Sequence, residues 1–265
     1  MSEREDSSSV AVERALAILE TVAQRGSLSN SELSRKLEIP KSSASYLLRT
    51  LEQRGYLRRE RASGKYYLGL KILNLSNSVR VGQDLREIAL PAMQQLVEKI
   101  HLTTHLGILD HGEAVYIAKV EAPGFFKTDT WVGRRMPVHA TAVGKVLIAV
   151  LPPAEVEAII KEQGMVKKTA KTITVASKLM RELEKVSEQG YAIDDEENSP
   201  GGRCVAAPVY DSMGLIVAAV GVSGTTTQND LAHLPKVIEQ VRSTARRISQ
   251  QLGYRTTGSG FSQPG

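Results

Sequence analysis

Three short helical segments, separated by Gly26 and Pro40 and ended by Gly55, restrict the fold of this chain more than any other feature. Apolar residues recur at helical spacing in "SVAVERALAILETVAQRG", "SLSNSELSRKLEIP" and "KSSASYLLRTLEQRG". Glycine commonly ends a helix, whereas proline stops one helix and fits the start of the next. Ser29 or Asn30 is the candidate N-cap of the second segment. Three such helices, with a tight turn between the second and the third, are typical of a helix-turn-helix.

A β-hairpin is predicted directly after the third helix. The segment "YLRRERASGKYYLGL" has apolar residues on both sides of a charged run, with a turn signal at Ser63 and Gly64. A two-stranded hairpin with a basic tip is the wing of a winged helix. We therefore expect a disordered tail at residues 1–9 and a winged helix-turn-helix at residues 10–68.

The charge of the chain is divided unevenly between its two parts. Residues 1–80 hold 14 Lys/Arg and 9 Asp/Glu, whereas residues 81–265 hold 20 of each kind. The whole net charge of +5 therefore lies in the first third. A small basic domain joined to a neutral larger one indicates that the first binds a polyanion. Together with the winged helix, this charge predicts binding to double-stranded DNA.

The third helix is expected to enter the major groove. Its leucines must be buried, so its polar residues face the DNA. Arg49 either reads a guanine through two hydrogen bonds or holds a phosphate. The serines either contact DNA or cap the helix. Lys41 suits phosphates, and two basic residues near the wing tip suit the flanking backbone or minor groove. The predicted DNA-contacting residues are Lys41, Ser42, Ser43, Ser45, Tyr46, Arg49, Arg61 and Lys65.

The remaining chain predicts a linker helix and a second domain. Residues 69–83 predict a linker helix with a break near Gly82. Its leucines, Leu70, Leu73 and Leu75, pack either against a second copy of the chain, which we expect, or within the monomer. Residues 84–253 predict an α+β domain of antiparallel strands with helices gathered on one side, similar to the GAF and PAS folds. The Gly/Ser-rich tail at 254–265 is expected to be disordered.

Several classes of protein are excluded by composition. No apolar run reaches the roughly 18 to 20 residues that a membrane-spanning helix needs. The polar N-terminus has no apolar segment of the kind that a signal peptide requires. The single Cys204 excludes an internal disulfide framework. We therefore expect a cytoplasmic protein that associates with no membrane.

The chain from about Val10 to Gly253 resembles the IclR-type transcriptional regulators. The resemblance rests on "LSRKLEIPKSSASYLLRTLEQRGYL", "VGRRMPVHATAVGKVLIAVLP", "EQGYAIDDEE" and "RCVAAPVYDSMGLIVAAVGVSG", which occur in the family's order and spacing. It implies a ligand-responsive regulator of a catabolic pathway. Such a regulator would bind operator DNA as a homodimer or a tetramer. Its C-terminal domain would bind a small organic acid, such as an aromatic, sugar or keto acid. We expect no cofactor.

The same resemblance implies an effector pocket. The sequence departs from the family's pattern at two positions. Gly221 replaces a frequent serine, which means a roomier pocket or a ligand with fewer oxygens. On the DNA-binding side, Tyr46 replaces a frequent arginine. Asp195 is the ambiguous neighbour of Asp194. The expected effector-binding residues are Thr141, Ala142, Asp194, Cys204, Gly221 and Ser223.

The stretch "MPVHATAVGK" also resembles a phosphate-binding loop, but it lacks two required residues. A Walker loop needs G-x-x-x-x-G-K-[ST], whereas His139 stands at the first glycine and Val146 at the Ser/Thr. We interpret the Gly144–Lys145 pair as incidental. A loop entering a helix N-terminus still suits a carboxylate, which we expect Thr141 and Ala142 to bind.

Other chemistries compete with this interpretation. Cys204 as a nucleophile would need a base, and no Cys-His arrangement is evident. An ionised Asp194 would repel a carboxylate, so it binds a ligand hydroxyl, carries a proton or faces elsewhere. His101, His105 and His139 are expected to be solvated or packed, although a structural metal site near them stays open. The rival classes are an enzyme with a fused DNA-binding domain and a constitutive architectural DNA binder. We expect neither catalytic residues nor a metal.

Overall fold

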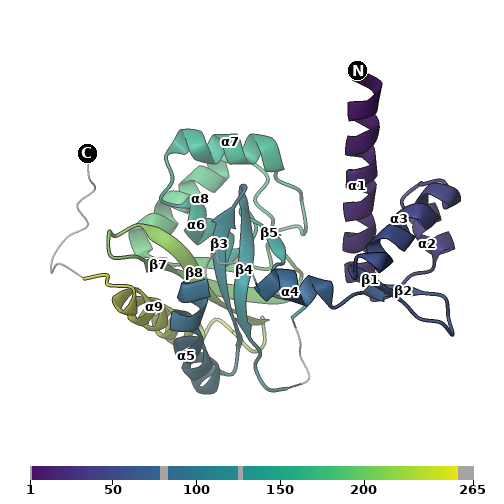
Figure 1. Ribbon diagram of the computed structural model, residues 1–265. Helices are drawn as coiled ribbons and strands as arrows, with labels where there is room; N and C mark the ends of the chain where they lie inside the picture. The colour runs from purple at the N-terminus through teal and green to yellow at the C-terminus, as the bar shows by residue number, and fades with distance from the viewer. Residues whose placement is uncertain (1, 78–82, 125–127, 256–265) are drawn as a thin grey trace. The chain divides into compact units, whose positions relative to one another are not determined.

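The computed structural model describes residues 2–77, 83–124 and 128–255, and the chain forms two compact units, Met1–Val81 and Gly82–Gly265 (Figure 1). The division falls at the break expected near Gly82. Residues 78–82, the end of the predicted linker helix, lie outside the described residues, as do 256–265 of the predicted tail.

The first unit contains three helices, a two-stranded antiparallel hairpin and a fourth helix. In chain order they are α1 (Ser2–Arg25), α2 (Asn30–Lys36), α3 (Lys41–Gln53), β1 (Leu57–Arg59), β2 (Tyr66–Leu68) and α4 (Lys71–Asn77). Residues 2–9, which we expected in a disordered tail, lie in α1 instead. The core of this unit joins α1 to α3 and the hairpin through Ile18, Val22, Leu33, Leu48 and Leu57.

Local hydrogen bonds set the turn between α2 and α3. Ser29 is the N-cap of α2: its Oγ accepts the Glu32 N–H at 3.3 Å, and Glu32 Oε2 accepts the Ser29 N–H at 2.7 Å. The Ser34 hydroxyl donates to the Ile39 carbonyl at 2.6 Å, which closes the turn. Pro40 is the N-cap of α3. These bonds fix the entry of α3.

The second unit is built on a six-stranded antiparallel sheet with the strand order β5-β4-β3-β8-β7-β6. The segment "GFFKTDTWVGRRM" also predicts a strand, and within its described residues a strand, β5, begins at Arg135. The elements are α5 (Gln83–Ile100), β3 (Thr103–Asp110), β4 (Glu113–Val120), β5 (Arg135–Pro137), α6 (Ala142–Ile148), α7 (Pro153–Gln163), α8 (Ala176–Gln189), β6 (Ala192–Asp195), β7 (Gly202–Tyr210), β8 (Ile216–Thr225) and α9 (Leu234–Gln251).

Helices cover both faces of this sheet, which corrects the expectation that they gather on one side. Figure 1 shows α5 and α9 on one face and α6, α7 and α8 on the other. Two separate apolar cores result, because neighbouring residues of β8 point to opposite faces and both faces are buried: Val220 packs under α5 and α9, and Ala219 packs under α6. The α+β class itself is confirmed. Among the described residues, no helix is long and apolar enough to cross a membrane.

Candidate nucleic-acid interface and effector site

The polar face of α3 is exposed as the sequence predicts. Ala44, Leu48 and Leu51 are buried against the first unit's core. Tyr46 is 68% exposed, an unusual position for an aromatic ring. The other predicted contacts are exposed at Lys41, Ser42 and Arg49 and half-buried at Ser43 and Ser45. These side chains therefore form one continuous polar surface along α3.

The wing presents more cationic groups than the sequence analysis named. Arg61 is exposed and Lys65 half-buried at the tip. The sequence reasoning missed Arg58 and Arg59, which lie exposed on β1. Their guanidinium carbons stand 5.2 Å and 5.6 Å from the ring centroids of Tyr67 and Tyr66. Stacking on an aromatic ring orients a guanidinium and leaves N–H groups at its edge for phosphates, although the Arg59 Nε–H also donates to the Gly64 carbonyl at 3.4 Å. Arginines followed by tyrosines on the partner strand were the available signal.

Three predicted effector residues stand in one row on the α6 side of the sheet. Asp194 of β6 lies opposite Cys204 of β7, and Cys204 lies opposite Ser223 of β8. Side chains directly opposite on neighbouring strands share a face. Gly221 lies one step along β8, opposite His105 of β3. The fold thus brings together residues that are far apart in the chain.

Hydrogen bonds continue this row through His105, which we expected to be solvated or packed, with a structural metal site as the open alternative. The Cys204 thiol donates to Ser223 Oγ at 3.3 Å, and Ser223 Oγ lies 3.5 Å from His105 Nδ1. His105 Nε2 lies 2.7 Å from Thr130 Oγ1, and the imidazole stacks on Tyr116 with centroids 4.5 Å apart. Burial lowers the pKa of His105 to about 3, so its ring is neutral. We call Asp194, Cys204, Ser223, His105 and Tyr116 the polar row.

Asp194 and Asp195 have different surroundings. Asp194 is 4% exposed, and its Oδ1 accepts N–H bonds from Glu197 at 2.8 Å and Asn198 at 3.2 Å. Burial raises the pKa of Asp194 to about 7, against the opposing effect of these two bonds. Near neutral pH it therefore exchanges between its charged and its protonated form. Asp195 pairs with Arg203, whose Nε donates to Oδ1 at 2.7 Å. It belongs to a separate ion pair.

The two residues at the start of α6 differ in what they offer a ligand. Thr141 is the N-cap: its hydroxyl donates to the Pro137 carbonyl at 2.8 Å and accepts the Gly144 N–H at 3.1 Å. The hydroxyl is therefore already used within the protein. Ala142 is buried. A Cβ at Gly221 would stand 2.9 Å from Val143 Cγ2, so α6 fills that space and the absent side chain leaves no room.

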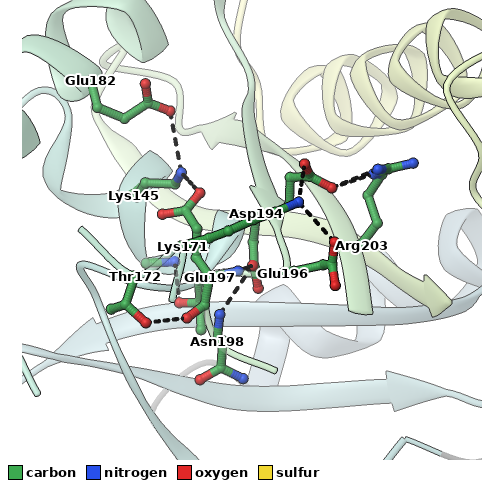
Figure 2. A network of polar contacts seen from close by, with 12 residues as sticks. Lys145, Lys171, Thr172, Glu182, Asp194, Glu196, Glu197, Asn198 and Arg203 are labelled. Carbon is green, nitrogen blue, oxygen red and sulfur yellow. Dashed lines mark hydrogen bonds and ion pairs between the residues drawn. The ribbon is translucent and has the colours of Figure 1, made fainter. Parts of the chain in front are cut away.

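The Gly144–Lys145 pair, which we interpreted as incidental, contributes a buried cation. Figure 2 shows the Lys145 ammonium between two carboxylates, with Nζ 2.6 Å from Glu197 Oε1 and 3.2 Å from Glu182 Oε1. Lys145 has no exposed surface. The Glu197 N–H donates a hydrogen bond to Asp194, so Glu197 links the Lys145 ammonium on α6 to the polar row. The sequence does not show whether a glycine or a lysine is buried, and sequence reasoning therefore missed this network.

The chemistry of the row does not suit catalysis or metal binding. Burial raises the pKa of the Cys204 thiol to about 12, so it carries no thiolate at neutral pH. His139 Nε2 lies 3.2 Å from the Val166 carbonyl. In the described part of the chain, no three His, Cys, Asp or Glu side chains gather where a metal ion would fit. The row can instead exchange neutral hydrogen bonds with a ligand.

Comparisons with known proteins agree over nearly the whole chain. Residues 11–61 match the IclR helix-turn-helix domain, and residues 78–250 match the bacterial transcriptional regulator IclR C-terminal domain. The HTH-type transcriptional regulator XynR of Escherichia coli is 39% identical over 92% of this chain and 97% of XynR.

Solved structures share the same arrangement of elements. The IclR of Thermotoga maritima is 31% identical with a TM-score of 0.76, covering 92% of this chain and 98% of that one. An IclR homologue from Microbacterium hydrocarbonoxydans, complexed with 4-hydroxybenzoate, is 24% identical with a TM-score of 0.79, covering 91% and 98%.

Proposed function

The chain belongs to the IclR family of bacterial transcriptional regulators, and we propose that it binds a small organic acid over the polar row. It is a DNA-binding transcriptional regulator and not an enzyme. We assign it to the control of a catabolic pathway, where an acid on the pathway would serve as the signal. Operator DNA lies in the bacterial cytoplasm, and we place the regulator there.

The single observation that carries the effector site is that Asp194, Cys204 and Ser223 lie directly opposite one another on three strands, with His105 of the fourth strand one step along, opposite Gly221. These groups are mostly buried and neutral or close to neutral, and hydrogen bonds link Cys204, Ser223 and His105. Such a surface suits the hydroxyl or keto oxygen of an acid. The homologue complexed with 4-hydroxybenzoate is 24% identical and so supports the fold alone, and the effector site is therefore argued from the row itself. Aromatic, sugar and keto acids are the classes to test.

The DNA contacts are proposed from exposure and charge. Arg49 and Tyr46 project from the exposed face of α3, and Arg61 and Lys65 stand at the wing tip. Arg58 and Arg59 join them as phosphate contacts, because their guanidinium groups are exposed and stacked. Base edges are read from α3, whereas the wing contributes charge.

A homodimer or tetramer is proposed as the functional form. Leu70 before α4 and Leu73 on it are 79% and 60% exposed, and Leu75 is 44% exposed. Apolar side chains at this exposure favour burial against a second copy. Effector binding would then bias the geometry of the paired DNA-binding units and so change operator affinity.

The experiment that tests the effector site is a thermal-shift screen of small organic acids, followed by calorimetry. A ligand at 100 times its dissociation constant stabilises the fold by about 2.7 kcal/mol. Ser223→Ala removes a hydrogen-bonding hydroxyl from the row, and we expect effector affinity to fall about tenfold with unchanged operator binding. Ser177→Ala, at an exposed serine of α8, is the matched control. An unaltered titration of Ser223→Ala would remove this residue from the site.

A further inference from the structure

Arg134 extends the polar row to the far edge of the sheet. The Tyr116 N–H donates to the Arg134 carbonyl at 3.1 Å, and the Gly133 N–H donates to the Tyr116 carbonyl at 2.7 Å, so this segment pairs with β4. Met136, two residues on, packs in the same core cluster as Tyr116. Alternation along an extended strand therefore places the Arg134 side chain on the face of Tyr116. Arg134 directly precedes β5, and it is followed across the sheet by Tyr116, His105, Ser223, Cys204 and Asp194, one residue from each of β4, β3, β8, β7 and β6.

The guanidinium of Arg134 is positioned but incompletely bonded. Nη1 lies 2.8 Å from Asp129 Oδ2, yet this buried nitrogen has no hydrogen-bond partner of acceptable geometry among the described residues. The Arg134 guanidinium carbon stands 4.5 Å from the ring centroid of Trp131, which orients its plane. The Asp129 side chain is 90% exposed, so its attraction for Arg134 is weakened by water. A ligand carboxylate that forms two aligned bonds would replace Asp129 favourably.

Among the described residues on this side of the row, Arg134 is the cation that remains available. Lys119 stands near His105, but its ammonium already bonds Glu121 at 2.7 Å and the Thr130 carbonyl at 2.7 Å. The pKa of the Tyr116 hydroxyl reflects charges of both signs around it. Burial raises this pKa, and the nearby Cys204 and Asp194 raise it further, whereas the positive charge of Arg134 lowers it. An acid bound along the row therefore meets positive potential at Arg134 and negative potential at Asp194.

We infer that Arg134 binds the carboxylate of the effector in place of Asp129, and that a hydroxyl or keto oxygen of the effector faces Ser223, Cys204 and Asp194. This inference rests on the proposed effector site and fixes the direction in which the acid lies. It selects acids that carry an oxygen function away from the carboxylate. It also assigns Asp129 as an internal competitor of the ligand.

Calorimetric titration with 4-hydroxybenzoate and D-gluconate tests the inference. Arg134→Gln should lower the affinity for the acid about 10- to 100-fold, because a charged hydrogen-bonded contact is lost. Asp129→Asn should raise the affinity, and Arg134→Lys should fall between wild type and Arg134→Gln. The matched control is Arg135→Gln: this neighbour pairs with Glu113 and Asp110 on the other face, and its loss should leave the affinity unchanged. Equal affinities of wild type and Arg134→Gln would overturn the inference.

A second measurement covers the case in which neither acid binds wild type. That result would count against the proposed effector classes, whereas Arg134 can still be judged with acetate as a bare carboxylate. In folded Asp129→Asn protein, the side-chain Nε–H signal of Arg134, assigned by its loss in the double variant Asp129→Asn/Arg134→Gln, should shift saturably with millimolar acetate. The Arg135 signal should not. No shift at Arg134 would overturn the inference independently of the effector.

Discussion

Asp194 is a buried carboxyl group whose protonation couples stability to pH. Its pKa is about 7 in the folded chain against an ordinary value of 3.8. Between about pH 4 and 7 the folded state therefore holds a proton that the unfolded state has lost, and the free energy of unfolding falls as pH rises through this window. The loss amounts to at most about 4 kcal/mol for this shift.

Asp194→Asn should flatten that pH dependence. The asparagine Oδ1 can still accept the N–H bonds of Glu197 and Asn198, so the native contacts persist without the titrating group. Urea unfolding at pH 5 and pH 8 measures the effect. Asp195→Asn is the control, because the half-exposed Asp195 pairs with Lys171 and with the buried Arg203 rather than with the groups around Asp194, and its loss should leave the fall in stability in place. An unchanged slope in Asp194→Asn would contradict the role of this carboxyl.

Arg49 and Lys65 should differ in what they contribute to operator binding. Arg49→Ala should weaken binding by about 1–3 kcal/mol and relax the preference at one base pair if the side chain reads a guanine. Lys65→Ala should remove about one phosphate contact. The slope of log affinity against log salt concentration should therefore become shallower by about 1, while the sequence preference is preserved. Fluorescence anisotropy over a series of salt concentrations and operator variants separates the two. Wild-type binding by both variants at moderate salt would refute the docking proposed for α3 and the wing.

Among the elements, those with local signals followed from the sequence. The N-cap at Ser29, the left-handed Gly55 after α3 and the turn at Gly64 are each indicated by residue type, and the elements beside them appear where expected. The distribution of helices over both faces did not follow, because it depends on which strands pair. β3 pairs with β8, more than a hundred residues later in the chain, and no spacing encodes that register.

The residues of the candidate site were likewise only partly predicted from the sequence. Asp194, Cys204 and Ser223 were named through family resemblance, and only the sheet shows that they stand side by side. His105, Arg134 and Lys145 were missed as site residues, because each gains its role from partners brought by other elements. A histidine in a strand acquires a meaning only when its cross-strand neighbours are known.

Lys145 joins three elements, and its removal should destabilise the fold. Lys145→Met leaves the Glu197 carboxylate buried without its counterion, which costs about 3 kcal/mol or more. Adding Glu197→Gln should recover much of this loss, because the stranded charge disappears. Urea unfolding of the two single variants and the double variant gives the coupling between them.

An exposed lysine of α7 provides the comparison. Lys161→Met should change the free energy of unfolding by less than about 0.5 kcal/mol. If Lys145→Met were equally mild, the buried network would not hold α6 to α8 and to the turn after β6. α6 carries Val143 over the polar row, so a loosened α6 should also weaken effector binding.

At the level of the whole molecule, recognition of an operator depends on two copies of the first unit acting together. A single winged helix reads one short half-site, and a two-fold pair doubles the contacts. Leu73→Glu places a charge on the exposed apolar surface of α4, where we propose that the copies meet. We expect it to lower the assembly mass and to weaken operator binding at least about tenfold, because the half-sites are then bound separately.

Sedimentation velocity and anisotropy on a two-half-site operator measure these effects together. Met213→Glu is the control: Met213 is 81% exposed in the β7–β8 turn, so the same change of charge there should leave mass and affinity unaltered. If Leu73→Glu retained the wild-type mass and affinity, pairing would have to involve another surface. If mass fell while operator affinity stayed constant, a single copy would suffice for binding, and coupling through paired DNA-binding units would be wrong for this regulator.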